Sequence, residues 1–318
     1  MKLTEGKLEF TVPFNLMGIR IDKGIAIILP KYSRGQIQKW LKNGSITIDD
    51  KPVLPKLKIW GGEKISIIVQ DDVNKNKYQA EEMALDIVYE DNEIMVVNKP
   101  PGVVMHPGNG NWTGTLLNGL LYHNNHLATL PRAGIVHRLD KETSGLLVVA
   151  KTPMARSSLI DQLQKRMMTR EYTAVAMGII KKNGRIKEPI GRHPIHRTKM
   201  CVSKKGKDAI THYNPIESGL DWTLLNCKLE TGRTHQIRVH LKYKGGAILG
   251  DQKYGKKNIK FKKINKDFNN ILSNISGQVL HARTLEFSHP VKKKRMSFKS
   301  PLPDEFKKIL NFLSKLNS

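Results

Sequence analysis

The chain has 318 residues, of which 39% are hydrophobic, so it can bury the core of one large domain and a smaller one. Lysine and arginine total 54 against 28 acidic residues, and the resulting net charge of +26 favours a polyanionic partner such as nucleic acid. Because there is no long uncharged apolar run and no signal-peptide pattern, we expect a cytoplasmic protein that does not bind to membranes. Cys201 and Cys227 lack CxxC spacing, which argues against a zinc site or a disulfide framework.

Residues 19–70 have the pattern of a compact module with two helices and a small sheet. The segment before Pro30 predicts an apolar helix, and Ser33 is placed to cap a second helix that ends near Gly44. The strand-like stretches "SITI" and "KISIIVQ" follow. The second helix would leave one basic face, which fits either a solvated surface or a contact with RNA phosphates. The cations of that face are Arg34, Lys39 and Lys42.

The rest of the chain divides by composition. Residues 1–18 are an N-terminal extension, residues 71–84 form a polar linker, and residues 85–318 form a larger domain. Strands are expected at "EIMVVNKP", "GLLVVAKT", "REYTAVAMG", "WTLLNCKLE" and "THQIRVHL", and helices at "TGTLLNGLLYH", "TPMARSSLIDQLQKR" and "DEFKKILNFLSKL". Because the strands outnumber the helices and do not alternate strictly with them, the predicted fold class is α+β.

One short stretch, "GIVHRLDKETSG" at 134–145, concentrates charge just before an apolar strand. Taken alone, it is typical of a tight turn in which Asp140 and Thr143 satisfy nearby backbone N–H groups. Arg138 and Lys141 flank the aspartate, however, and would keep its carboxylate ionised, as a nucleophile requires. Local chemistry leaves both interpretations open.

Other catalytic patterns are weak. The two histidines of "THQIRVHL" would face opposite sides of a strand, and the sequence has no HExxH, CxxC or acidic cluster, so we expect no metal. The glycine-rich "GNGNWTG" lacks the Lys-Ser/Thr ending of a phosphate loop. A triad of Ser144, His137 and Asp140 would lack the GxSxG elbow.

Two resemblances add to these observations. The segment from "RIDKGIAIILP" to "GGEKISI" resembles an S4 RNA-binding domain. The segments "NKPPGVVMHPG", "GIVHRLDKETSGLLVVAKT", "REYTAVAMG" and "LETGRTHQIRVHL" occur in the order and spacing of the RluA family of pseudouridine synthases. The resemblance covers nearly the whole chain and is closest to the branch that modifies large-subunit ribosomal RNA.

The RluA resemblance implies a catalytic domain with a mainly antiparallel mixed sheet flanked by helices and loops. It implies an isomerase that detaches a flipped uracil from its ribose and rejoins it through C5, without a cofactor. Asp140 would attack C1′ or remove a ribose proton, and the two routes remain open. Arg233 would pair with this aspartate, and Tyr172 would stack on the uracil.

The same resemblance assigns further contacts. Arg138 would enter the RNA where the target base leaves. Ile237 and Leu241, on one strand face, would line the uracil pocket, although core packing explains them nearly as well. Lys99 and the loop at His106 would border the cleft.

The expected partner is large-subunit (23S) ribosomal RNA or the pre-ribosomal large subunit, bound by a monomer. Affinity would come mostly from phosphates and weaken with salt. A non-catalytic S4-type RNA-binding or ribosome-assembly protein is the alternative, but it leaves Asp140, Tyr172 and Arg233 without a role.

Overall fold

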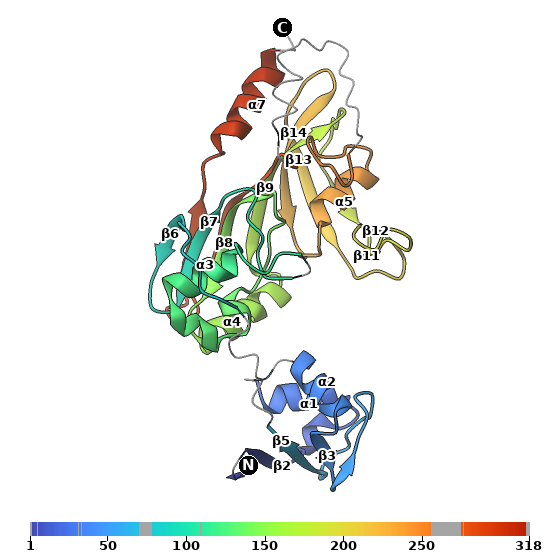
Figure 1. Cartoon of the computed structure of the whole chain (residues 1–318). Coiled ribbons are helices and arrows are strands. Elements are labelled where there is room, and N and C mark those ends of the chain that lie inside the picture. The colour runs from blue at the N-terminus through green and yellow to red at the C-terminus, as the bar shows by residue number, and fades with distance from the viewer. Residues whose placement is uncertain are drawn as a thin grey trace. The chain divides into compact units, whose positions relative to one another are not determined.

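The computed structural model of the chain describes residues 2–4, 6–30, 32, 34–69, 78–108, 110–255, 275 and 277–315. The chain forms two compact units, Met1–Lys77 and Tyr78–Ser318 (Figure 1). Residues 71–77 of the expected linker lie outside the described residues. Residues 78–84 belong to the larger unit, which therefore begins before the expected boundary at residue 85.

The described residues of the smaller unit form an antiparallel sheet with the strand order β1-β2-β5-β3-β4 and two α-helices. The treatment of residues 1–18 as an extension outside this module is wrong. Strand β2 pairs with β5, and its alternating Leu8 and Phe10 enter the core of the unit, as a period of two requires. The elements are β1 (Lys2–Thr4), β2 (Lys7–Thr11), α1 (Ile21–Ile28), α2 (Arg34–Lys42), β3 (Ile46–Ile48), β4 (Lys51–Pro52) and β5 (Lys64–Ile68).

Helix α2 has the orientation that the sequence predicts. It buries Ile37, Trp40 and Leu41, and the chain leaves it through Gly44 at φ +78°. The cap predicted at Ser33 lies outside the described residues. Asp49 and the next aspartate both have positive φ, at 46° and 62°, so the β3–β4 hairpin closes through the mirror-image turn that suits the strand twist.

The larger unit is built on a nine-stranded sheet with the order β10-β13-β14-β9-β15-β8-β7-β6, and β16 pairs with β15. In the part of the chain that the structure describes, β8 and β15 are the one parallel pair of this sheet, so it is mixed and mainly antiparallel, as predicted. Its strands are β6 (Ile87–Glu90), β7 (Ile94–Lys99), β8 (Ser144–Ala150), β9 (Thr169–Met177), β10 (Gly184–Lys187), β13 (Ile210–Ser218), β14 (Trp222–Leu229), β15 (Leu280–Ser288) and β16 (Arg295–Lys299).

Helices cover both faces of this sheet. On one face, α3 and α5 pack over side chains that include Val97, Val149 and Tyr172. On the other face, α4 packs over Val148 and α7 over Val175, and Figure 1 shows these two helices toward opposite ends of the sheet. The helices are α3 (Leu116–His123), α4 (Pro153–Gln164), α5 (Gln236–Tyr243) and α7 (Asp304–Lys315).

The helix predictions at α3, α4 and α7 are confirmed, and Thr152 caps α4 by accepting a hydrogen bond from the N–H of Ala155 at 3.1 Å. The strand predicted at "THQIRVHL" is wrong, because residues Gln236–Tyr243 form α5. Its apolar and polar residues alternate in sequence, as in a strand, yet all six residues 236–241 are buried. Since a helix buried all round shows no apolar stripe, its period cannot be read from hydrophobicity.

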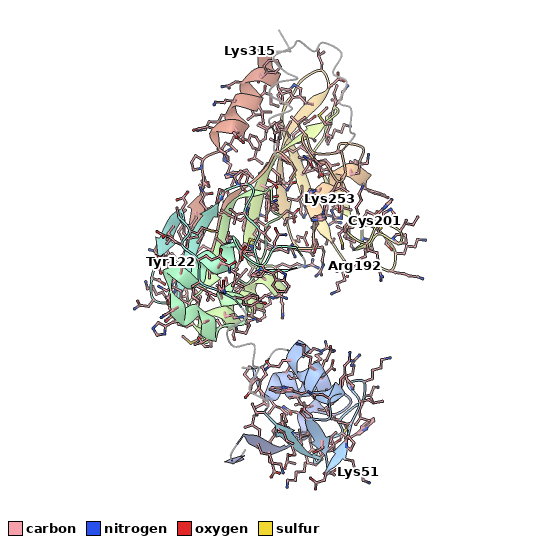
Figure 2. The ribbon with its side chains drawn as sticks, in the orientation of Figure 1. Lys51, Tyr122, Arg192, Cys201, Lys253 and Lys315 are labelled. Atoms are coloured by element: carbon pink, nitrogen blue, oxygen red, sulfur yellow. The ribbon has the colours of Figure 1, made fainter. Side chains whose placement is uncertain are left out.

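A two-stranded hairpin, β11 (Ile190–Arg192) and β12 (Met200–Val202), carries the basic stretch around "HPIHRTKM". Figure 2 labels Arg192 and Cys201 on it, where it projects from the larger unit. The second basic stretch, "KKNIKFKKINK", lies outside the described residues. None of the helices described here is long and apolar enough to span a bilayer.

Candidate active site

A cavity of about 800 Å³ opens on the sheet face that carries α3 and α5. Its walls come from the turn before β8, the end of α4, the start of β9 and the segment that leads into α5. Its lining is strongly basic, because the described residues that line it include two carboxylates, Asp140 and Glu230, and six arginines. These are Arg132, Arg138, Arg166, Arg170, Arg233 and Arg238.

Asp140 lies in the tight turn that its local sequence predicts. The N–H of Thr143 donates to the Asp140 carbonyl at 3.1 Å, and the Thr143 hydroxyl accepts from Gln278 Nε2 at 2.9 Å. Gly145 follows at φ +110°, where a Cβ would lie 2.3 Å from the carbonyl oxygen of Ala282. Only glycine therefore fits where the turn enters β8, and that close contact fixes the base of the turn.

Lys99 holds the same turn from behind. Its ammonium group is fully buried and donates to the carbonyl oxygens of Pro100, Val103 and Lys141 at 2.7, 3.0 and 2.9 Å. Burial lowers the Lys99 pKa to about 8. The prediction that Lys99 borders the cleft is therefore corrected. Lys99 is buried and holds the turn through its hydrogen bond to the carbonyl of Lys141, the residue after Asp140.

Asp140 pairs with a different arginine from the one expected. Arg238 Nη1 donates to Asp140 Oδ2 at 2.8 Å. Arg233 is exposed at the cavity wall, and its Nε donates to the carbonyl oxygen of Asp208 at 2.9 Å. The expected Arg233 pair is therefore corrected to Arg238, because the helical path of α5 turns Arg238 toward the aspartate.

Arg238 is itself fixed in place. Its Nε and Nη2 donate to the two carboxylate oxygens of Asp251 at 2.7 and 2.9 Å, and its guanidinium lies 5.1 Å from the ring centroid of Tyr254. Although burial opposes the charged form, the hydrogen bonds and charges of both aspartates raise the Arg238 pKa. Asp251 is buried, and the same arginine holds its pKa below the usual range against the effect of burial. Asp140 thus faces a permanent, immobile cation.

His235 completes the surroundings of the carboxylate. Its Nε2 lies 3.9 Å from Asp140 Oδ1, beyond hydrogen-bond distance, and its Nδ1 lies 2.7 Å from the Tyr254 hydroxyl. Burial lowers the His235 pKa to about 4, so the imidazole is neutral at pH 7. Its backbone is left-handed at φ +56°, an uncommon conformation for a non-glycine residue that is often found at functional sites.

An apolar wall stands beside this polar group. Tyr172 on β9 and Ile237 on α5 both line the cavity and are 5% and 4% exposed. Burial raises the Tyr172 pKa. Leu241 is fully buried one turn further along α5 and lies in the core, apart from the residues that line the cavity, so its predicted role as lining is wrong.

Arg138 and His106 also line the cavity, as expected. Arg138 is exposed, which leaves its guanidinium accessible from solvent. Burial lowers the His106 pKa to about 4.

The hydrolase triad does not form. Ser144 Oγ lies 2.9 Å from His281 Nδ1, while the Nε2 of His137 accepts a hydrogen bond from the N–H of Val148 at 3.1 Å. His137 therefore orients no serine. Among the residues that the structure describes, no three His, Cys, Asp or Glu side chains come together as a metal site.

In the smaller unit, the three predicted RNA-contact cations lie on α2. Arg34 Nη2 lies 2.8 Å from Oδ2 of Asp22, a fully buried carboxylate, while the Arg34 side chain stays 48% exposed. Arg34 therefore stabilises the contact of α2 with α1. Lys39 and Lys42 lie in the last turn of α2, where a positive charge interacts favourably with the helix dipole.

Three site residues were missed from the sequence: Arg238, Asp251 and Tyr254. Arg238 lies in "THQIRVHL", which carried the family resemblance, and the other two lie in the segment "GDQKYG" that follows it at 250–255. A signal for these residues was present in the sequence. "GDQKYG" places an acid and an aromatic residue between two glycines, and the preceding motif contains a second arginine, Arg238.

Comparison with known proteins agrees with this geometry. Residues 93–243 match the family model described as RNA pseudouridylate synthase. The chain is 46% identical over 312 residues to ribosomal large subunit pseudouridine synthase D of Nitrosomonas europaea, covering 98% of this chain and 89% of the relative. It is 48% identical to the protein of the same name from Neisseria meningitidis, covering 98% and 83%.

Solved structures give the same result. The human RNA pseudouridylate synthase domain containing 4 protein superposes with a TM-score of 0.55 at 26% identity, covering 72% of this chain and 92% of that one. The domain containing 1 protein gives 0.53 at 25% identity, covering 73% and 95%. The chain belongs to the RNA pseudouridylate synthase family, as an RNA-modifying isomerase.

Proposed function

We propose that this enzyme converts specific uridines of large-subunit ribosomal RNA to pseudouridine, with Asp140 as the reacting carboxylate. The observation that carries the proposal is the ion pair between Asp140 and Arg238, held rigid by Asp251. The ribosomal substrate follows from the relatives, which are named for the large subunit and match this chain over nearly its full length.

Each step uses a residue of the cavity. A target uridine leaves the RNA stack, at a cost of a few kcal/mol, and Arg138 is exposed where it can take the vacated position. Tyr172 stacks on the base, and Ile237 supplies apolar contact. Asp140 then attacks C1′ as the N1–C1′ bond breaks, or it removes a ribose proton. The freed uracil anion turns and bonds to C1′ through C5, which releases the Asp140 carboxylate or returns its proton to the ribose, and C5 gives up its proton while N1 gains one.

Arg238 orients the Asp140 carboxylate for either route. A carboxylate that is bound to a fixed guanidinium cannot rotate freely, so the reactive oxygen is positioned before the substrate arrives. Oδ1, which Arg238 does not bind, faces the neutral His235 across 3.9 Å and is the oxygen we assign to the reaction.

Binding to the RNA draws on both units. The net charge of +26 supplies long-range attraction to phosphates, and Lys39 and Lys42 of the S4-like smaller unit add local contacts. We place the enzyme in the cytoplasm as a monomer, with free ribosomal RNA or an assembling large subunit as its partner. The non-catalytic alternative is not favoured, because it gives no role to the pre-oriented ion pair between Asp140 and the buried Arg238.

The test is pseudouridine mapping on large-subunit ribosomal RNA that lacks this modification. Wild type should form pseudouridine at defined positions. Asp140→Asn should lower the rate by about 10³-fold or more while RNA affinity changes little, because the amide keeps the shape but cannot act as nucleophile or base. Asp161→Asn is the matched control, since Asp161 is exposed on α4 and pairs only with Lys165 among the described residues.

Two results would count against the proposal. Tight binding by wild type without any pseudouridine, on RNA and on precursor subunits alike, would favour the non-catalytic alternative. Activity retained by Asp140→Asn would remove Asp140 from the reacting role.

A further inference from the structure

Arg170 is a buried cation in the same cavity. It lies on β9 and is 6% exposed. Its Nη2 donates to the carbonyl oxygen of Glu230 at a long 3.5 Å, and its Nε is buried without a hydrogen-bond partner. Within the described ranges, no carboxylate forms an ion pair with it. A buried cation without a paired anion is unfavourable, so the site is incomplete without an anion.

His137 offers a second unpaired donor nearby. Its Nε2 accepts from a backbone N–H, so the proton of the neutral ring must be on Nδ1. Burial, together with the charge of Arg170, lowers the His137 pKa to about 3, so the ring stays neutral. The Nδ1 atom is buried and has no partner.

Both side chains belong to the wall of the proposed RNA-binding cavity. Arg170 and His137 line the cavity together with Asp140 and Tyr172. Arg170 precedes Tyr172 by two residues on β9, so both side chains project from the same face of the sheet. A Cβ at Gly232 would lie 2.7 Å from Arg170 Nη1, so the glycine leaves space for the guanidinium.

We propose that Arg170 and His137 form a seat for a non-bridging oxygen of the RNA phosphodiester that adjoins the flipped uridine. The proposal rests on the function proposed above. A phosphodiester carries a full, permanent negative charge and suits the donors of a guanidinium. The cavity of about 800 Å³ is in the range that encloses a whole nucleotide rather than a base alone.

The alternative ligand is the uracil itself, which carries negative charge only while it is detached. A permanent buried cation is better balanced by a permanent anion, which favours the phosphate. The two ligands differ in experiment, since a phosphate contact exists in the bound substrate and a contact to the uracil anion strengthens only during the reaction.

The test is a double-substitution cycle on synthetic RNA that contains a mapped target uridine. Neutral methylphosphonates replace, one at a time, the phosphates on either side of it. Wild type should lose about 10- to 100-fold in kcat/KM at one of the two positions. Arg170→Gln should lose a similar factor on natural RNA and nothing further on that methylphosphonate RNA. Arg166→Gln, which removes a rim arginine paired with Glu230 at 2.7 Å, should instead give losses that multiply.

Three outcomes would overturn the proposed phosphate seat. Wild type could keep its kcat/KM on both methylphosphonate RNAs, or the losses caused by Arg170→Gln and by the methylphosphonate could multiply. Arg170→Gln could also lower kcat alone while it stays as sensitive to the methylphosphonate as wild type. The last would assign Arg170 to the uracil anion. The wild-type measurement needs no variant, so misfolding of Arg170→Gln leaves it decisive. If wild type makes no pseudouridine on natural RNA, the proposed function itself has failed, which is a different result.

Discussion

All three guanidinium nitrogens of Arg238 donate hydrogen bonds to the carboxylates of Asp140 and Asp251. One side of the planar group binds both oxygens of Asp251, and the remaining nitrogen reaches Asp140. A lysine has a single nitrogen and cannot span both carboxylates in this way. The identity of the residue, and not only its charge, therefore sets the position of Asp140.

We predict that Arg238→Gln lowers kcat by at least about 100-fold and also destabilises the larger unit, because Asp140 and Asp251 lose their shared cation. Arg238→Lys should recover little of the activity. Single-turnover rates with urea unfolding as a second readout would measure both effects.

Arg233→Gln is the matched comparison from the same segment. It removes an exposed guanidinium bound to a backbone carbonyl, so it should weaken RNA binding with a far smaller change in the single-turnover rate. The reverse ranking of the two variants would restore Arg233 as the partner of Asp140.

At this scale the sequence predicts the turn that holds Asp140, but it does not predict the arginine that pairs with it. The aspartate stands in a turn whose flanking charges can be read directly. Two arginines follow at 233 and 238, and the choice between them depends on whether the segment is a strand or a helix. Tertiary packing determines that this segment is a helix. Because residues 236–241 are all buried, their hydrophobicity shows no helical period.

The turn and strand that carry Asp140 depend on one close contact. Gly145, the second residue of β8, lies opposite Ala282 of the parallel neighbour β15, with no space for a side chain. The mirror-image conformation and the short approach are both available only to glycine. The sequence predicts that Gly145 follows a turn. It does not predict the close contact with β15, because that strand lies more than a hundred residues further along the chain.

We predict that Gly145→Ala lowers the free energy of unfolding by about 2–5 kcal/mol, since the methyl group adds a clash to backbone strain. Gly178→Ala is the control, because Gly178 has φ +90° with no atom within 4 Å of the added carbon. It should cost only about 1–2 kcal/mol. Equal losses in urea titrations would show that the close approach to β15 contributes nothing.

The two units differ in how their charges respond to acid. All eleven histidines follow residue 77, and burial lowers the pKa of four of them to about 3–4: His106, His137, His235 and His281. The unfolded chain binds protons at these side chains below pH ~6.5, whereas the folded unit does so only near pH 4. Acid therefore favours unfolding of the larger unit.

We predict that the larger unit loses stability as the pH falls from 6.5 to 5, by up to about 1.4 kcal/mol per histidine for each pH unit. The smaller unit, which contains no histidine, should change little over the same interval. Hydrogen exchange of the full chain, resolved by peptide, would follow both units together. Equal responses in the two units would contradict the histidine explanation.

The sequence predicted the whole molecule as an α+β catalytic domain with a smaller basic module, and it placed both helices of that module. It missed the strand β2, because a few alternating residues near a terminus carry too little signal until their partner β5 is known. Long-range pairing was the common cause of the errors in both units.

The trio of Asp140, Arg238 and Asp251 carries two negative charges and one positive charge, hence one net negative charge. In either route proposed above, Asp140 becomes neutral, as an ester of the ribose or as the acid that has taken its proton. Arg238 and Asp251 then remain as an exactly balanced pair at 2.7 and 2.9 Å. Within this trio the intermediate therefore leaves no unpaired charge, because Asp251 remains as the counterion of Arg238 while Asp140 is neutral.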